Sequence, residues 1–212
     1  LSEEEVNAAM LSPIPRHKHL LPKIAPHLAW RVKAEGMRVQ TTLEFELQRT
    51  LERISRDILL HQRSNLAILV ANGQSGEILG YVGSQNYYST DRSGAFDYAR
   101  AVRSPGSTLK PLTVAGLLQY GLASLEDMFD TESGSWTVGG RTIEDVNNEH
   151  GPMTLARALQ ISSSVGVAKA AQAMRPAVQY ENLRDFGLGA LTGIGLPGES
   201  RGRLRLPEDW SG

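Results

Sequence analysis

The apolar positions in residues 43–61 recur at helical spacing. Steps of three and four residues place side chains on one face of an α-helix, and charged residues occupy the positions between them. The pattern predicts an amphipathic core helix with a solvated opposite face, from about Glu44 to His61. Its apolar members are Leu43, Leu47, Leu51, Ile54 and Ile58.

Two apolar runs after this helix have the composition of paired strands. Residues 66–70 and residues 77–82 are rich in Ile, Leu and Val, and residues 72–76 between them contain Asn and Gly. Two such runs around a short Gly-containing loop predict a β-hairpin. Residues 37–43, with Val and Thr, predict one further short strand before the helix.

The second half of the chain alternates predicted helices with Gly-rich turns. The Gly- and Ser-rich residues 131–148 predict a small hairpin around a Gly-Gly pair. A long polar loop, residues 83–104, precedes the first helix, and such loops usually carry function or cover a site. Apolar spacing and capping residues predict four helices, at residues 107–121, 154–161, 165–174 and 176–186.

The N-terminal residues divide into a short helix and a Pro-rich segment. Residues 2–5, Ser-Glu-Glu-Glu, have the pattern of a capping box and predict a helix to about Met10. Residues 11–29 contain four prolines and three histidines, which predicts an extended linker. His17 and His19 form a His-x-His pair, but no third ligand stands at a useful spacing, so we predict no metal site.

Composition narrows the classes of function. The chain is 41% apolar and 21% charged, like an ordinary globular protein, and it has no cysteine for disulfide or thiol chemistry. Its net charge of −1 gives no excess of positive charge of the kind that indicates nucleic-acid binding. No signal peptide is visible, and no apolar run approaches the ~20 residues of a membrane helix. Because the chain begins with Leu1, we expect it to be a segment of a longer protein.

Residues 103–111, Arg-Ser-Pro-Gly-Ser-Thr-Leu-Lys-Pro, bring a serine and a lysine together. If a helix opens at Ser107, Lys110 lies on the same face, with Cβ atoms about 5–6 Å apart. A serine needs a base beside it, and a lysine serves only when desolvation or a neighbouring cation lowers its pKa. The Pro-Gly pair suits the turn into the helix, whose free N–H groups suit an oxyanion. The alternative is a chance match, because the Ser-x-x-Lys spacing alone is a weak signal.

This segment resembles the nucleophile motif of bifunctional penicillin-binding proteins. The resemblance implies that Ser107 is the acylated residue and that Lys110 accepts its proton. It also implies a serine β-lactamase/transpeptidase-like α/β (α+β) fold, with an antiparallel sheet flanked by helices. Residues 41–48, Thr-Thr-Leu-Glu-Phe-Glu-Leu-Gln, resemble the opening of the same transpeptidase domains.

The second motif of the family is Ser-x-Asn, and this chain has Ser162-Ser163-Ser164 in the matching context. The resemblance assigns to Ser162 the relay of a proton between Lys110 and the leaving group, and to Ser164 the place of the substrate-binding asparagine. A serine is shorter and lacks the amide, so we expect contact through water and a weakened site. The alternative is a plain serine turn between two helices. A literal Ser-x-Asn at residues 84–86 precedes the nucleophile, which is the wrong order for the family.

The third motif of the family, Lys-Thr/Ser-Gly, does not occur in the 212 residues. Residues 186–199 resemble the segment that leads to the last strands in monofunctional, division-type penicillin-binding proteins, and their glycines do not fit a phosphate-binding loop. We therefore expect a sheet that is truncated before its last strands. Residues up to about Asp130 resemble the bifunctional type 1C class, whereas those from about Ser133 resemble the division class.

These resemblances imply a domain organisation and an activity. Residues 1–29 are the tail of a glycosyltransferase domain with its Pro-rich linker, and residues 30–212 are a penicillin-binding transpeptidase domain that is incomplete at its C-terminus. The implied activity is that of an acyl-serine D,D-transpeptidase, which cross-links peptidoglycan and binds penicillin covalently at Ser107. The alternative is a catalytically inactive fragment or scaffolding piece. A β-lactamase is disfavoured because the chain has no Glu-x-x-Leu-Asn arrangement.

The implied ligands and partners are peptidoglycan stem peptides, β-lactam antibiotics and other cell-wall synthesis proteins, with no nucleic acid, no cofactor and no metal. The implied location is periplasmic or otherwise extracytoplasmic, with the parent protein anchored in the cytoplasmic membrane. The candidate site residues are Ser107, Lys110, Ser162 and Ser164.

Overall fold

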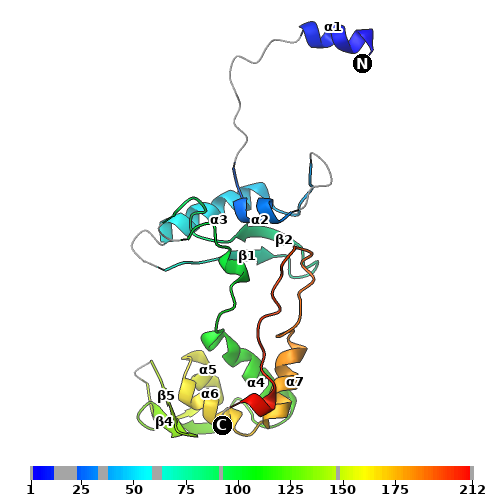
Figure 1. Cartoon of the computed structure of the whole chain (residues 1–212). Helices are drawn as coiled ribbons and strands as arrows, with labels where there is room; N and C mark the ends of the chain where they lie inside the picture. The colour runs from blue at the N-terminus through cyan, green and yellow to red at the C-terminus, as the bar shows by residue number, and fades with distance from the viewer. Residues whose placement is uncertain are drawn as a thin grey trace. The chain divides into compact units, whose positions relative to one another are not determined.

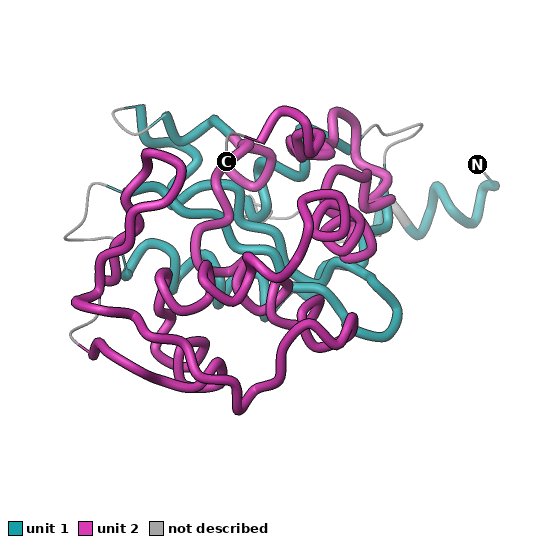
Figure 2. Tube along the Cα trace, turned by 90° about the horizontal axis from the view of Figure 1, so that it is seen from below, with its two compact units in different colours: residues 1–96 teal, residues 97–212 magenta. Residues whose placement is uncertain are grey.

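The computed structural model describes six stretches of the chain (Figure 1), residues 2–11, 23–32, 38–58, 64–90, 93–146 and 149–210. The chain divides into two compact units, residues 1–96 and residues 97–212, which Figure 2 shows in separate colours. All four candidate site residues belong to the second unit. Within the described stretches, no helix is long and apolar enough to span a membrane.

α1 (Glu3–Leu11) begins with the predicted capping box. The Ser2 N–H donates to Glu5 Oε2 at 2.8 Å, and the Glu5 N–H donates to Ser2 Oγ at 3.2 Å. This reciprocal pair satisfies two N–H groups that the start of a helix would leave open. Most of the predicted linker, with His17 and His19, lies outside the described residues.

The end of the predicted linker is helical, since α2 spans Pro26–Arg31. Pro26 stands in the first turn, where its fixed φ suits a helix and its missing N–H removes no hydrogen bond. His27 and Leu28 are buried, and His27 Nε2 hydrogen-bonds the Gly94 carbonyl at 2.8 Å. The linker prediction is wrong here, because proline is equally compatible with a helix start and burial of these side chains stabilises the helix.

α3 (Phe45–Ile58) matches the predicted amphipathic helix, of which residues 59–61 lie outside the described part. Its buried face is more polar than the sequence predicts. Gln48 and Ser55 are fully buried, whereas Ile58 is 60% exposed. The helix is therefore rotated from the face that apolar spacing alone predicts.

β1 (Ile68–Ala71) and β2 (Ile78–Val82) form the predicted antiparallel hairpin, with Leu69 opposite Tyr81. Gln48 of α3 binds the backbone of β2. Its Oε1 accepts the Tyr81 N–H at 2.7 Å, and its Nε2 donates to the Tyr81 carbonyl at 2.9 Å. The buried amide thus satisfies backbone groups that a neighbouring strand would otherwise pair.

The strand predicted at residues 37–43 is not present, since its described part, residues 38–43, contains no strand. The segment reaches β2 at its end, where Thr42 Oγ1 donates to the Ile78 carbonyl at 2.6 Å and the N–H of the following Glu44 donates to the Leu79 carbonyl at 2.9 Å. β-branched residues favour strands, but a strand needs a ladder partner along its length.

The described part of the second unit is built around four α-helices: α4 (Lys110–Gln119), α5 (Leu155–Gln160), α6 (Ser164–Ala171) and α7 (Pro176–Asp185). All four overlap their predicted positions, and a 3-10 turn, η2 (Gly106–Leu109), leads into α4. α4, α5 and α6 share one apolar cluster, made of Val114, Leu117, Met153, Leu155, Ala158, Val167, Ala170 and Met174. α4 and α6 therefore pack against each other.

The strands of the second unit form two antiparallel pairs. β4 (Ser135–Val138) and β5 (Arg141–Glu144) make the predicted hairpin, around a Gly-Gly turn with positive φ at both residues. β3 (Met128–Asp130) pairs with β6 (Pro152–Thr154), which leads directly into α5. The described strands thus make three two-stranded antiparallel sheets, and the mixture of helix and sheet agrees with the predicted fold class.

The remaining described segments are mostly irregular. The predicted long loop, residues 83–104, contains one 3-10 turn, η1 (Tyr98–Arg100), and its residues 91–92 lie outside the described part. Residues 186–206 carry neither helix nor strand and end at a further 3-10 turn, η3 (Pro207–Asp209).

Leu117→Ala should lower the free energy of unfolding by about 2–5 kcal/mol, because the Leu117 side chain is fully buried in the helical cluster. Leu118→Ala is the matched control at the next position of α4, where the side chain is 40% exposed, and it should cost less than about 1 kcal/mol. Urea unfolding followed by circular dichroism compares the two. Equal losses would contradict the burial of Leu117.

Candidate active site

The nucleophile segment forms a 3-10 turn that runs into α4. η2 begins after Pro105, Gly106 has a φ of 57°, and Pro111 lies in the first turn of α4, as predicted. The Lys110 N–H donates to the Ser107 carbonyl. Because side chains at i and i+3 eclipse in a 3-10 turn, Ser107 and Lys110 lie on the same side.

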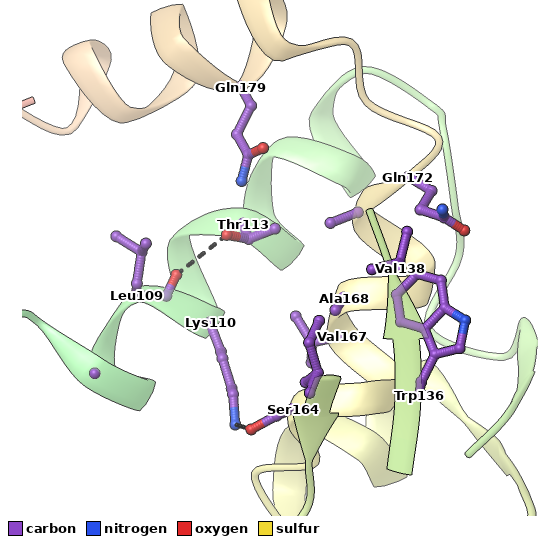
Figure 3. A pocket seen from close by; sticks show the side chains of 13 residues that line it. Leu109, Lys110, Thr113, Trp136, Val138, Ser164, Val167, Ala168, Gln172 and Gln179 are labelled. Atoms are coloured by element: carbon purple, nitrogen blue, oxygen red, sulfur yellow. Dashed lines mark hydrogen bonds between the residues drawn. The ribbon is translucent and has the colours of Figure 1, made fainter. Parts of the chain in front are cut away.

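Lys110 joins this segment to the second predicted motif. Its Nζ donates to the Ser162 carbonyl at 2.5 Å, to Ser162 Oγ at 3.2 Å and to Ser164 Oγ at 3.1 Å. Figure 3 shows the bond to Ser164. Three of the four predicted residues therefore meet, although 52 and 54 positions separate Lys110 from the two serines.

Ser107 is exposed in η2, the turn that precedes α4. The structure describes both Ser107 and Lys110, and it shows no hydrogen bond from the Ser107 hydroxyl to Lys110 Nζ. Catalytic hydrogen bonds are often long or poorly aligned before a substrate binds. The exposed hydroxyl is therefore open to a ligand, while the amine is held by the second motif.

Burial lowers the pKa of the Lys110 ammonium below its ordinary value, and the negative charge of Asp145 acts in the opposite direction. Desolvation is the larger effect, so this amine loses its proton more readily than a solvated lysine. An ammonium fills its three N–H donors with the three oxygens described above. A neutral amine has a lone pair, to which the Ser162 hydroxyl can donate. Lys110 and Ser162 can thus exchange a proton in either direction.

Ser162 has a strained backbone, with a φ of 58°. It follows α5 in a Schellman arrangement: its N–H donates to the Leu159 carbonyl at 3.1 Å, and the Ser163 N–H donates to the Ala158 carbonyl at 2.7 Å. Glycine usually occupies this position, because a left-handed conformation costs other residues about 1–2 kcal/mol. Such strain is typical of functional sites.

Ser164 stands where the family has an asparagine, and its hydroxyl lies within hydrogen-bonding distance of Lys110 Nζ. A direct hydrogen bond at 3.1 Å therefore stands where the shorter side chain predicts contact with Lys110 through water. The literal Ser-x-Asn at residues 84–86 belongs to the first unit, where Ser84 Oγ donates to the Gly94 carbonyl at 2.6 Å.

Asp145 joins this cluster, although it belongs to none of the sequence motifs. It follows β5, and its Oδ1 accepts the Ser164 N–H and the Val165 N–H, the latter at 3.0 Å. Its Oδ2 accepts the Ser163 hydroxyl at 2.7 Å. These partners lie 18 to 20 positions further along the chain, and no spacing rule connects an acid after a hairpin to so distant a helix start.

A pocket of about 410 Å³ adjoins Lys110. Its walls come from α4, α6 and the β4–β5 hairpin, with Gln179 of α7 at the top of the view in Figure 3. Lys110 and Ser164 contribute polar groups at one edge. A concave, mostly apolar surface with a few polar groups is typical of ligand sites. The apolar lining is Leu109, Trp136, Val138, Ile143, Val167, Ala168 and Ala171.

Comparisons with known proteins agree on one family. A family model described as the penicillin-binding protein transpeptidase domain matches residues 66–212. The peptidoglycan D,D-transpeptidase FtsI of Escherichia coli strain K12 is 34% identical over 154 residues, which are 70% of this chain and 26% of that protein. Penicillin-binding protein 1C of the same strain is 30% identical over 194 residues, which are 88% of this chain and 25% of that protein.

The fold agrees as well. The solved structure of penicillin-binding protein 3 from Mycobacterium tuberculosis, complexed with ampicillin, matches with a TM-score of 0.66 and 28% identity over 83% of this chain and 42% of that chain. The chain spans about a quarter of the length of the two relatives above. The match to penicillin-binding protein 1C covers 88% of the chain and therefore extends into both parts of the sequence. It does not test whether the first part resembles the bifunctional class and the second the division class, so that division stays a prediction.

Ser162→Gly should be more stable than Ser162→Ala, because both variants lose the hydroxyl but only glycine adopts a positive φ without strain. We expect a difference of about 1 kcal/mol in the free energy of unfolding. At Ser164, the first residue of α6, whose φ is not positive, the same comparison should favour alanine by up to about 0.5–1 kcal/mol. Urea unfolding of the four variants measures both differences. The same sign at both positions would contradict the left-handed conformation of Ser162.

Proposed function

Because this chain belongs to the penicillin-binding protein transpeptidase domain family, we propose that it is an acyl-serine D,D-transpeptidase of peptidoglycan cross-linking. Ser107 is the nucleophile, Lys110 is the base, Ser162 relays the proton and Ser164 binds the substrate. The observation that carries this assignment concerns Lys110, which lies one turn after Ser107 in the chain and whose Nζ is hydrogen-bonded to the first and third serines of the second motif, Ser162 and Ser164.

Acylation begins when the neutral Lys110 amine removes the proton of the Ser107 hydroxyl. Ser107 Oγ then attacks the carbonyl carbon of the D-Ala–D-Ala bond of a stem peptide, and N–H donors stabilise the oxyanion. As the C–N bond breaks, the proton passes from Lys110 through the Ser162 hydroxyl to the amine of the leaving D-Ala. The product is an ester at Ser107, with Lys110 neutral again.

An amine of a second stem peptide resolves this ester by the reverse proton route, which forms the cross-link and frees Ser107. A penicillin follows the first half of the route. The amide bond that breaks is part of its ring, so the leaving amine stays attached and the ester persists. The relative complexed with ampicillin supports this part of the proposal.

The competing proposal is a catalytically inactive or scaffolding piece. It is favoured by one observation: the 212 residues contain no Lys-Thr/Ser-Gly sequence. In the family this third motif supplies an oxyanion donor, and one such donor contributes about 2.7–4 kcal/mol in the transition state. Ser164 in place of asparagine changes a hydrogen bond worth about 0.5–1.5 kcal/mol.

The same proposal extends to ligands, partner proteins, location and domain organisation. Stem peptides and β-lactams are the ligands, other cell-wall synthesis proteins are partners, and the location is extracytoplasmic, in a parent protein anchored in the cytoplasmic membrane. Of residues 1–29, those before α2 are the tail of a glycosyltransferase domain with its linker, and the chain from α2 to residue 212 belongs to the transpeptidase domain. The proposed steps use side chains and backbone groups alone.

Incubation with a penicillin should add the mass of one penicillin molecule to the wild-type chain and none to Ser107→Ala. Ser133→Ala, at an exposed serine of the same unit, is the matched control and should be labelled like the wild type. Intact-mass spectrometry measures the adduct, and circular dichroism verifies folding. An adduct on Ser107→Ala would exclude Ser107 as the nucleophile, and no adduct on a folded wild-type chain would favour the inactive alternative.

The acylation rate should rise with pH and reach half of its maximum below pH 10.5, the ordinary pKa of a lysine amine. Only the neutral amine accepts the serine proton, and its fraction grows as pH rises through the pKa. Burial lowers the pKa of Lys110, so the rise occurs at lower pH than for a solvated lysine. Labelling rates with a fluorescent penicillin at a series of pH values test this.

Lys110→Arg is the control for the pH profile, because a guanidinium stays protonated and provides no base. We expect this variant to lose both the labelling and the pH-dependent rise. A wild-type rate that does not change with pH would contradict the role of Lys110 as the base.

A further inference from the structure

Asp145 anchors the first turn of α6 to the β4–β5 hairpin. Its N–H donates to the Gly134 carbonyl at 2.8 Å, which fixes its backbone to the turn before β4. Its carboxylate accepts three hydrogen bonds, from the Ser164 N–H, the Val165 N–H and the Ser163 hydroxyl. One side chain therefore links the end of a hairpin to the start of a helix.

Ser163 extends this link to a third N–H of the helix. Its fully buried hydroxyl donates to Asp145 Oδ2 at 2.7 Å and accepts the Gly166 N–H at 2.9 Å. Together, Asp145 and Ser163 satisfy the N–H groups of Ser164, Val165 and Gly166, which have no partner within the helix. The two residues act as one cap, in which Asp145 supplies the charge that the start of a helix favours.

This cap lies between the two serines that bind Lys110. Ser162 and Ser164 flank Ser163 in the chain, so a shift of the first turn of α6 would move them away from Lys110 Nζ. Ser162 also has a strained positive φ, so the segment depends on the contacts that hold it at both ends. The end of α5 provides one anchor, and Asp145 provides the other.

We propose that Asp145 is a positioning residue of the acylation site, and that its cap on α6 holds the Ser162 and Ser164 oxygens at Lys110 Nζ. This inference rests on the proposed function, because the position of these oxygens matters for acylation only if Lys110 and Ser162 take part in it. It concerns a residue outside the three sequence motifs, and it assigns that residue no contact with the substrate.

The charge of Asp145 does not itself help the reaction. The carboxylate favours the protonated form of Lys110, which raises its pKa, whereas a base must be neutral. The contribution of Asp145 to acylation is therefore geometric. A neutral side chain of the same shape keeps an oxygen acceptor for the N–H groups of α6 and should preserve that contribution.

Three variants of the 212-residue chain separate geometry from charge. Asp145→Ala removes the cap, whereas Asp145→Asn keeps an acceptor of the same shape without the charge. Asp127→Ala is the matched control, because the Asp127 carboxylate accepts the Ser124 N–H at 2.9 Å in a different turn of the same unit. Each variant is measured for its acylation rate with a fluorescent penicillin, and for hydrogen exchange of the Ser164 and Val165 amides by NMR.

Asp145→Ala should lower the acylation rate about tenfold or more, because a small misplacement of catalytic groups has a large effect on rate. Exchange of the Ser164 and Val165 amides should rise by about tenfold or more, because they lose their acceptor. Asp145→Asn should keep at least about a third of the wild-type rate together with the amide protection. Asp127→Ala should match the wild type in both measurements.

Two outcomes would overturn the proposal: values for Asp145→Ala equal to those for Asp127→Ala, or an Asn variant as defective as the Ala variant. If Asp145→Ala does not fold, Ser163→Ala takes its place, because it removes the hydroxyl that links Asp145 to Gly166. An unchanged acylation rate together with unchanged exchange of the Gly166 amide, whose acceptor is the Ser163 hydroxyl, would also overturn it. If the folded wild-type chain takes no penicillin, the proposed function fails, while the amide exchange still decides whether Asp145 holds α6.

Discussion

The hydrogen bonds from Lys110 Nζ to Ser162 and Ser164 connect segments that lie more than 50 positions apart in the chain. They exist because α4 and α6 pack on one apolar cluster, in which Leu117 and Leu155 are fully buried. The same packing withdraws the lysine amine partly from water, which lowers its pKa. The helical core therefore controls both the position and the protonation of the candidate base.

The site combines a strained segment with two capped helix ends. Ser162 adopts a positive φ between the end of α5 and the start of α6, where Asp145 and Ser163 satisfy the first N–H groups. These contacts offset a strain of about 1–2 kcal/mol and bring two Ser162 oxygens to Lys110. Two of the groups that transfer a proton in the proposed reaction, Lys110 and Ser162, thus lie within hydrogen-bonding distance of each other.

Local elements were predictable from the sequence where they depend on near neighbours. Apolar spacing predicted α3, a Gly-Gly turn predicted the β4–β5 hairpin, and residues 107–110 predicted a serine and a lysine on one side of a turn. Predictions of secondary structure were wrong where contacts with distant parts of the chain determine the local conformation. Pro26 starts a helix because its neighbours His27 and Leu28 are buried, and residues 38–43 form no strand because they lack a ladder partner.

By itself, then, the sequence determined the order of the helices and hairpins and the motifs that indicate acyl transfer. Each of these features depends on residues that lie one or two turns apart in the chain. Only the tertiary structure decided that Gln48 is buried against β2, that Ser164 reaches Lys110 directly, and that Asp145 caps α6. These contacts join residues 18 to 54 positions apart. No local spacing encodes such pairs, since they depend on how separate elements pack around a shared core.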